Sequence, residues 1–305
     1  MDTVLERLAP GSRVAVVRLR SLGDCVLTTP ALALLKKARP DLQIAVVVQQ
    51  AFAPIFAGNP DVAAILPPSA AELAAWRPVL TVNLHGGATS LRLTLASRSR
   101  FRAGFRHFRF RLLYNIRIPR AQEILKINRR VHTAEHLASA MFYLGVPPSE
   151  IPRARLYASK PAGESTYAVL HPKASAEDKT WPAAKFLQTA EHLQKHLGIE
   201  PVFIAGPGES LEEFGRHRTV VGASLENTKA LLAGASLFIG NDSGPAHMAA
   251  AFGLPTVVLF GSSDVEIWRP WRTESAVLTH ASGIHSIDCS EVFQAVEKLA
   301  LPQPK

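Results

Sequence analysis

The sequence has few cysteines and no long apolar segment. Only Cys25 and Cys289 occur in 305 residues, far apart and without the cysteine and histidine spacing of a zinc ligand set. A structural disulfide or zinc site is therefore not expected. No run of about 18 uncharged apolar residues is present, and the first residues do not have the build of a signal peptide. We therefore expect a cytoplasmic protein.

Two motifs of nucleotide-dependent enzymes are also missing. No Asp-x-Asp pair, of the kind that holds a diphosphate-bound cation, occurs in the chain, so we expect neither a metal nor another cofactor. A dinucleotide-dependent oxidoreductase would need Gly-x-Gly-x-x-Gly directly after a strand, and Gly206-Pro-Gly208 lacks the third glycine. The pattern argues against that enzyme class.

Composition and charge indicate a globular protein with an uneven charge distribution. The chain is 47 % hydrophobic and 19 % charged, and its length favours two domains. Residues 1–160 carry 23 Lys and Arg against 9 Asp and Glu, whereas residues 161–305 carry 11 against 16. The first half is thus expected to meet an anionic partner, namely nucleic acid, a membrane surface or an acidic substrate.

Apolar segments alternate with amphipathic ones in both halves, which predicts parallel sheets with helical crossovers. Strands are expected at 13–19, 43–48, 62–66, 79–84, 167–171, 201–205 and 237–239, and helices at 26–38, 70–76, 132–145, 183–197 and 227–234. The proline-rich residues 147–161 are expected to link a domain of residues 1–155 to one of residues 156–305. Ligands of such sheets bind beyond the carboxyl ends of the strands.

A polar turn expected at residues 240–244 leads into a helix with Pro245 in its first turn and Gly253 at its end. Unpaired N–H groups and the helix dipole make such a helix start a site for phosphate or pyrophosphate. The alternative is an ordinary strand-to-helix junction with an N-cap.

The segment Asp242-Ser-Gly-Pro-Ala-His247, with the run that continues to Gly261, resembles the donor-binding segment of ADP-heptose:lipopolysaccharide heptosyltransferases, glycosyltransferase family 9. Residues 19–32 resemble the amino-terminal motif of the same family. The resemblance implies an α/β protein of GT-B architecture, with two Rossmann-like doubly wound parallel-sheet domains facing a central cleft. It also implies inverting, metal-independent transfer of heptose or a related sugar from an ADP-sugar to an anionic lipopolysaccharide inner-core acceptor.

The resemblance also assigns site residues. Asp24 matches the aspartate regarded as the general base of the family, although an aspartate before a helix is also a common cap. The residues expected to bind the donor are Lys179, Glu209, Asp242, Ser243, Gly244, Pro245 and His247. The residues expected to bind the acceptor are Ser21, Gly23, His85, Arg102, Arg106 and Arg109. The family commonly has Asp in place of Asn83 and Arg in place of Thr89, and both departures lie on the acceptor side.

Arginines alternate with phenylalanines over residues 98–111. This pattern suits a solvated basic loop, a surface for single-stranded nucleic acid, or a site for the phosphates and carboxylates of an anionic glycolipid. The family resemblance favours the glycolipid. We therefore expect as partners a nucleotide-sugar donor, an anionic glycolipid acceptor and, peripherally, the inner membrane surface. We expect no nucleic-acid partner, and a monomer.

Overall fold

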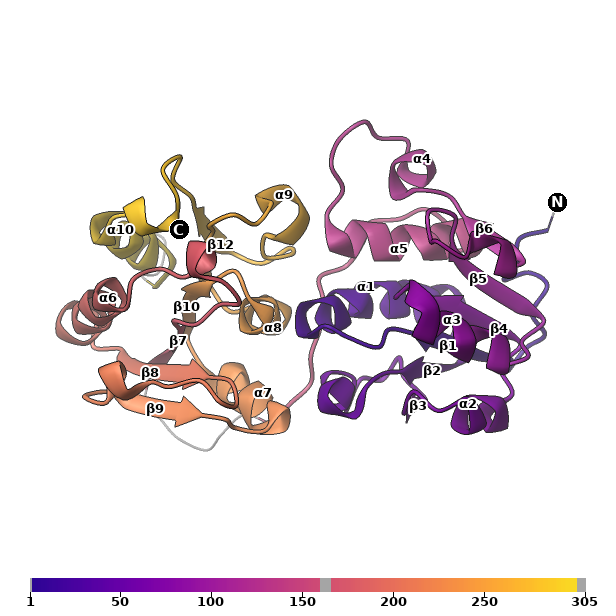
Figure 1. Ribbon diagram of the computed structural model, residues 1–305, viewed down its shortest axis with the longest axis horizontal. Coiled ribbons are helices and arrows are strands. Elements are labelled where there is room, and N and C mark those ends of the chain that lie inside the picture. Colours follow the sequence, from indigo (N-terminus) through magenta and orange to yellow (C-terminus); the bar gives the residue numbers. More distant parts are fainter. Residues whose placement is uncertain (1, 160–165, 301–305) are drawn as a thin grey trace. The chain divides into compact units, whose positions relative to one another are not determined.

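The computed structural model describes residues 2–159 and 166–300, and the chain divides into two compact units, residues 1–157 and 158–305. Each unit has a six-stranded sheet whose pairings are all parallel, with helices packed on it (Figure 1). Within the described part of the chain, none of the helices combines the length and apolar character that a membrane crossing requires.

The sheet of unit 1 has the strand order β3-β2-β1-β4-β5-β6. Order along the chain therefore reverses between β1 and β4, which are hydrogen-bonded neighbours in the middle of the sheet. This reversal creates the crevice beyond the carboxyl ends where ligands of such folds bind. The strands are β1 Arg13–Val17, β2 Gln43–Val47, β3 Ala64–Leu66, β4 Leu80–Asn83, β5 Phe101–Phe105 and β6 Ile116–Ile118.

Helices α1 and α5 of unit 1 pack side by side (Figure 1). The described helices and 3₁₀ turns of this unit are α1 Leu22–Ala38, η1 Gln50–Ile55, α2 Ala70–Trp76, α3 Gly87–Ala96, η2 Arg111–Leu113, α4 Ala121–Leu125 and α5 Thr133–Leu144. Central strands such as β1 are apolar on both faces because helices bury them.

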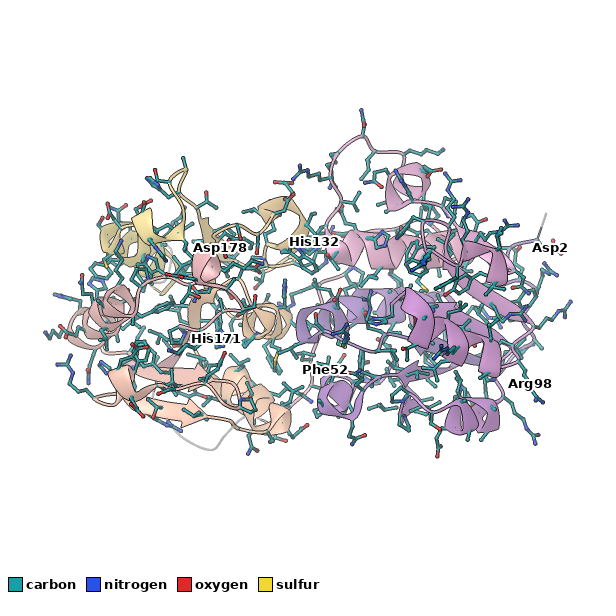
Figure 2. All side chains as sticks on the ribbon, viewed as in Figure 1. Asp2, Phe52, Arg98, His132, His171 and Asp178 are labelled. Carbon is teal, nitrogen blue, oxygen red and sulfur yellow. The ribbon has the colours of Figure 1, made fainter. Side chains whose placement is uncertain are left out.

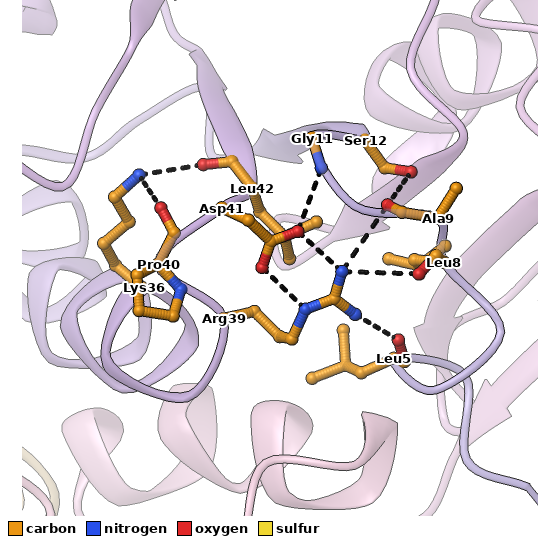
Figure 3. Close-up of polar contacts among 10 residues, drawn as sticks. All are labelled: Leu5, Leu8, Ala9, Gly11, Ser12, Lys36, Arg39, Pro40, Asp41 and Leu42. Carbon is orange, nitrogen blue, oxygen red and sulfur yellow. Dashed lines mark hydrogen bonds and ion pairs between the residues drawn. The ribbon is translucent and has the colours of Figure 1, made fainter.

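Polar contacts fasten the end of α1 to the start of the chain (Figure 3). The guanidinium of Arg39 donates to both carboxylate oxygens of Asp41, at 2.8 and 2.7 Å, and Asp41 also accepts the N–H of Gly11 at 3.0 Å. Arg39 holds the pKa of the Asp41 carboxyl well below its usual range. Lys36 donates to the carbonyls of Pro40 and Leu42, which satisfies oxygens beyond the helix end.

The sheet of unit 2 has the order β12-β11-β10-β7-β8-β9. Read from β9, this is the same connectivity as in unit 1, with the reversal between β7 and β10. The strands are β7 Tyr167–His171, β8 Glu200–Ala205, β9 Arg218–Val221, β10 Leu237–Asn241, β11 Thr256–Leu259 and β12 Ser275–Leu278. Both sheets therefore have the Rossmann strand order.

One core of unit 2 forms around Trp181, Phe186 and Phe203, all without exposed surface. Trp181 donates its indole N–H to the carbonyl of Ile287 at 3.0 Å, so its polar atom is satisfied inside the core. The helices and 3₁₀ turns are η3 Glu177–Lys179, α6 Ala183–His196, η4 Glu212–Phe214, α7 Leu225–Gly234, α8 Gly244–Phe252, α9 Val265–Trp268, η5 Ile284–Ser286 and α10 Cys289–Ala300.

The α/β class with two doubly wound parallel sheets is confirmed, while several boundaries differ from those expected. Helix α1 begins at Leu22, not at Val26, because Ser21 takes the N-cap position. Strand β10 continues through Asn241, since its hydrogen bonds to β11 extend that far. Residues 147–159 contain neither helix nor strand, and residues 160 and 161 of the expected link lie outside the described residues.

Candidate functional site

In unit 1 the segments that follow β1 and β4 meet at the reversal of strand order. Ser21, Gly23 and Asp24 form the first turn of α1, directly after β1, and His85 follows β4. Asp24 lies close enough to His85 to act on its charge, as do Arg18 and Arg20. The sheet thus brings together the expected general base, Asp24, and three of the residues expected to bind the acceptor.

Asp24 is held at the start of α1 by two neighbours. One carboxylate oxygen accepts the hydroxyl of Ser21 at 3.0 Å and its N–H at 3.4 Å. The other oxygen lies 3.3 Å from Nη1 of Arg18. The Arg18 side chain is 8 % exposed and that of Asp24 24 %, so the aspartate alone keeps a face toward solvent. A carboxylate fixed by both oxygens and still accessible has the geometry of a proton acceptor.

His85 lines a pocket of about 350 Å³ at the carboxyl ends of β1, β2 and β4. Burial is the main cause that lowers the pKa of His85, and the charges of Arg18 and Arg20 lower it further, so its imidazole is neutral near pH 7. The pocket is lined by Leu19, Arg20, Gln49, His85, Gly86, Gly87, Ala88 and Thr89.

Asn83 shapes the turn that carries His85. Its side-chain oxygen accepts the N–H groups of His85 and Gly86, each at 3.0 Å, and its amide donates to the hydroxyl of Tyr114 at 2.9 Å. Asn83 is fully buried, and an amide satisfies all these partners without burying a charge. This is a physical reason for asparagine at the position where the family commonly has aspartate.

Three arginines expected on the acceptor side lie on or just after β5, two strands away from β1 in the sheet order. Arg102 donates to the carbonyl of Ser99 at 2.8 Å and is partly buried. Arg106 is exposed and forms an ion pair with Glu123. Arg109 lies over the ring of Phe110, at 5.5 Å from its centroid. The structure therefore does not gather these arginines around Asp24.

Arg106 lines a second pocket of unit 1, which is basic and has a volume of about 590 Å³. The pocket is lined by Arg106, His107, Arg111, Arg117, Arg120 and Glu123. Four guanidinium groups against one carboxylate give it a strong preference for anions.

In unit 2 the reversal of strand order lies between β7 and β10, and His171 and Ser243 stand at the two strand ends. Figure 2 labels His171. Its Nδ1 lies 3.1 Å from the hydroxyl of Ser243, the N-cap residue of α8. That hydroxyl makes no hydrogen bond to the helix, so α8 has no side-chain cap. Its first N–H groups thus stay available to an anion.

Lys179 and Asp242 lie beside this helix start. Burial raises the pKa of Asp242, whereas the nearby Ser263 and the positive charge of Lys179 lower it. Turn η3, which carries Lys179 and the labelled Asp178 of Figure 2, packs against Gly261 after β11. A Cβ at Gly261 would lie 1.8 Å from the carbonyl oxygen of Asp178, so only glycine allows this contact.

The other residues expected on the donor side surround the same strand ends. Gly244 and Pro245 form the first turn of α8, and His247 follows one turn in, 5 % exposed, with its ring 6.1 Å from that of Trp268. Glu209 lies in the loop after β8, where its carboxylate accepts the N–H of Gly206 at 2.6 Å. Glu209 thus closes its own loop in this structure.

Sequence reasoning missed three polar residues that position the site: Arg18 behind Asp24, His171 behind Ser243, and Asn241. Asn241 is fully buried at the end of β10, accepts the N–H of Trp181 at 3.0 Å and donates to the carbonyl of Pro172 at 2.9 Å. Each interrupts or ends an otherwise apolar strand, a signal available from the sequence. Among the described residues, no cluster of three or more His, Cys, Asp or Glu side chains has the arrangement of a metal site.

Comparison with known proteins finds similarity to one protein family along most of the chain. Residues 80–294 match the family model for glycosyltransferase family 9 (heptosyltransferase). Lipopolysaccharide heptosyltransferase 3 of Escherichia coli is 30 % identical over 289 residues, which cover 83 % of this chain and 84 % of that protein.

Solved structures show the same fold. A glycosyltransferase family 9 protein from Veillonella parvula has a TM-score of 0.83 at 21 % identity and covers 95 % of this chain and 97 % of its own. E. coli heptosyltransferase WaaC with ADP has a TM-score of 0.78 at 22 % identity, with 94 % and 100 % covered. The GT-B architecture expected from the sequence is confirmed. The chain belongs to glycosyltransferase family 9, the heptosyltransferase family, and is a glycosyltransferase.

Proposed function

We propose that this protein transfers heptose from ADP-heptose to an anionic inner-core acceptor of lipopolysaccharide, with inversion at the anomeric carbon and without a metal. The observation that carries the proposal is the uncapped start of α8 with Lys179 beside it, in a chain of family 9. The curated relative is named a lipopolysaccharide heptosyltransferase, and a protein of the same fold was solved with ADP. Both names support this donor and this acceptor class.

The donor's diphosphate binds at the start of α8 in this proposal. The N–H groups of Gly244 and its neighbours, with the helix dipole, meet one phosphate, and the ammonium of Lys179 meets the other. His247, one turn in, borders the same end of the helix, and Glu209 receives a hydroxyl of the ribose or the sugar once its loop contact opens. Asp242, buried beside Lys179, receives hydroxyls of the sugar.

Asp24 acts as the general base on the acceptor side. Its carboxylate takes the proton of the attacking hydroxyl, whose oxygen forms the new bond to the anomeric carbon. The bond from that carbon to the diphosphate oxygen breaks, and its electron pair leaves with ADP. The neutral His85 and the pocket beside it receive the acceptor sugar, and the exposed Arg106 meets its anionic groups.

The negative charge that develops on the leaving ADP is stabilised by Lys179 and the α8 N-terminus, so the proposal needs no cation there. Groups already oriented toward that charge lower the barrier without reorganisation. This arrangement replaces the divalent ion that an Asp-x-Asp enzyme would use.

The test is nucleotide release from a panel of sugar nucleotides, with a truncated lipopolysaccharide inner core as acceptor and EDTA present. Among these sugar nucleotides, we expect only ADP-heptose to release its nucleotide in a reaction that depends on the acceptor. ADP at 100 times its dissociation constant should stabilise the protein by about 2.7 kcal/mol in EDTA. Lys179→Met should lose that stabilisation, whereas Lys195→Met, at an exposed ion pair of the same unit, should keep it. Loss of binding or transfer in EDTA would refute the metal-free proposal.

A further inference from the structure

Among the residues that the structure describes, six large hydrophobic side chains are exposed, and three of them lie within four positions. Leu112 is 77 % exposed, Leu113 48 % and Phe110 38 %. All three belong to the loop of residues 106–113, which forms most of the connection from β5 to the edge strand β6. A concentration of apolar surface of this kind marks an interaction site.

Packing contacts with the rest of unit 1 hold this loop in a conformation that exposes its tip. Phe108 packs so closely on Gly86 that a Cβ there would lie 2.9 Å from the ring. Tyr114, directly after the loop, is 2 % exposed, lies across Gly104 and accepts the amide of Asn83. The loop is thereby fastened through the half-buried ring of Phe108 and the buried ring of Tyr114, while its apolar tip faces outward.

Positive charge surrounds this apolar tip. Arg109 and Arg111 alternate with Phe110 and Leu112 in the loop itself and are exposed. The adjoining pocket adds Arg106, Arg117 and Arg120, with Glu123 as its one acidic residue. Apolar side chains flanked by several arginines match a surface that is anionic at its face and apolar just beneath.

We propose that residues 106–113 dock unit 1 on an anionic phospholipid bilayer. Phe110, Leu112 and Leu113 enter the boundary between head groups and acyl chains, and the surrounding arginines bind lipid phosphates. The loop is fastened through Phe108 and Tyr114 to the turn of Gly86 and Asn83, which borders the pocket of His85. Docking therefore holds that pocket at the membrane surface.

The test is flotation of the full-length protein with vesicles of phosphatidylcholine alone or with about a third phosphatidylglycerol. Because no glycolipid and no sugar nucleotide is present, the result is independent of the proposed sugar transfer. We expect binding to the anionic vesicles only, weakened by raising salt from about 0.1 to 0.5 M. No binding to anionic vesicles would overturn the proposal.

Variants separate the apolar tip from general charge attraction. Replacing both leucines, Leu112→Ser with Leu113→Ser, should raise the lipid concentration at half-binding about tenfold or more, because two leucine side chains no longer leave water. Leu95→Ser, at a leucine 40 % exposed on α3, is the matched control and should bind as the wild type does. Equal binding by the double variant would refute insertion.

Single-stranded nucleic acid is the other partner that arginines and aromatic residues can serve. An oligonucleotide bound through Phe110 and the two leucines, together with no vesicle binding, would assign the loop to nucleic acid and overturn the proposal. If the double variant failed to fold, Phe110→Ser would replace it, with the same expected direction. Melting curves of each variant establish folding, and exposed positions of this kind are expected to leave them unchanged.

Discussion

Replacing Asp24 by asparagine separates its chemical role from its structural one. The amide has one acceptor oxygen, whereas the carboxylate uses both, one for Ser21 and one for Arg18. The side-chain oxygen of asparagine can still accept the hydrogen bond from the hydroxyl of Ser21. Arg18 then loses its only charged partner in the described structure, and its Nε already has no hydrogen-bond partner among the described residues.

The cost to stability follows from the burial of that pair. Breaking a fully buried ion pair costs about 3–5 kcal/mol. Because the Asp24 side chain is 24 % exposed, we expect about 2 kcal/mol here. In a unit of this size that corresponds to a fall in Tm of roughly 4–8 °C. Turnover should fall by about 10² to 10⁴, the usual contribution of a positioned general base, with ADP affinity unchanged.

A double variant distinguishes lost catalysis from lost stability. Arg18→Met removes the buried guanidinium, so Arg18→Met with Asp24→Asn should be more stable than Asp24→Asn alone. The double variant should nevertheless remain inactive, because the proton acceptor is still missing. Melting curves and turnover rates of the wild type, the two single variants and the double variant are the assay. Recovery of activity together with stability, or an Asp24→Asn variant with more than about a third of wild-type turnover, would refute Asp24 as the base.

Three other results are expected. Burial lowers the pKa of His136 and of His171 to about 4, below the ordinary 6.5, so the unfolded state binds more protons between these values. Stability in urea should therefore fall as pH decreases from 6.5 toward 4, by roughly 3 kcal/mol per histidine, and His136→Phe should flatten this dependence. Unchanged stability over that pH range would contradict the lowered pKa values of these two histidines. Arg106→Ala should raise the KM for the acceptor several-fold and weaken its salt dependence without changing ADP affinity, measured by initial rates and by titration with ADP. An equal weakening of acceptor and ADP binding would instead indicate damage to the fold. Gly261→Ala must displace η3 and, with it, Lys179, so ADP should bind about tenfold or more weakly by calorimetry. Wild-type affinity would show that η3 does not position the donor site.

The sequence by itself determined the fold class and the location of the two strand ends that carry the site. Local patterns suffice for this, because apolar strands, amphipathic helices and turn residues are encoded within a few positions of one another. The helix start near Asp242 could be predicted in this way, since glycine, serine and proline are typical of that position. The same locality explains why Gly253 was correctly placed at the end of α8.

Only the tertiary structure decided which side chains meet. Arg18 reaches Asp24 across the short turn between β1 and α1, whereas His171 reaches Ser243 because β7 and β10 are neighbours although 72 positions separate the two residues. No local pattern encodes the pairing of His171 with Ser243, since parallel neighbours are joined through long crossovers. The loop of residues 106–113 shows the same limit: arginine and phenylalanine alternate along it, but packing on Gly86 and Gly104 leaves Phe108 half-buried and Tyr114 buried, with Phe110 and Leu112 outside.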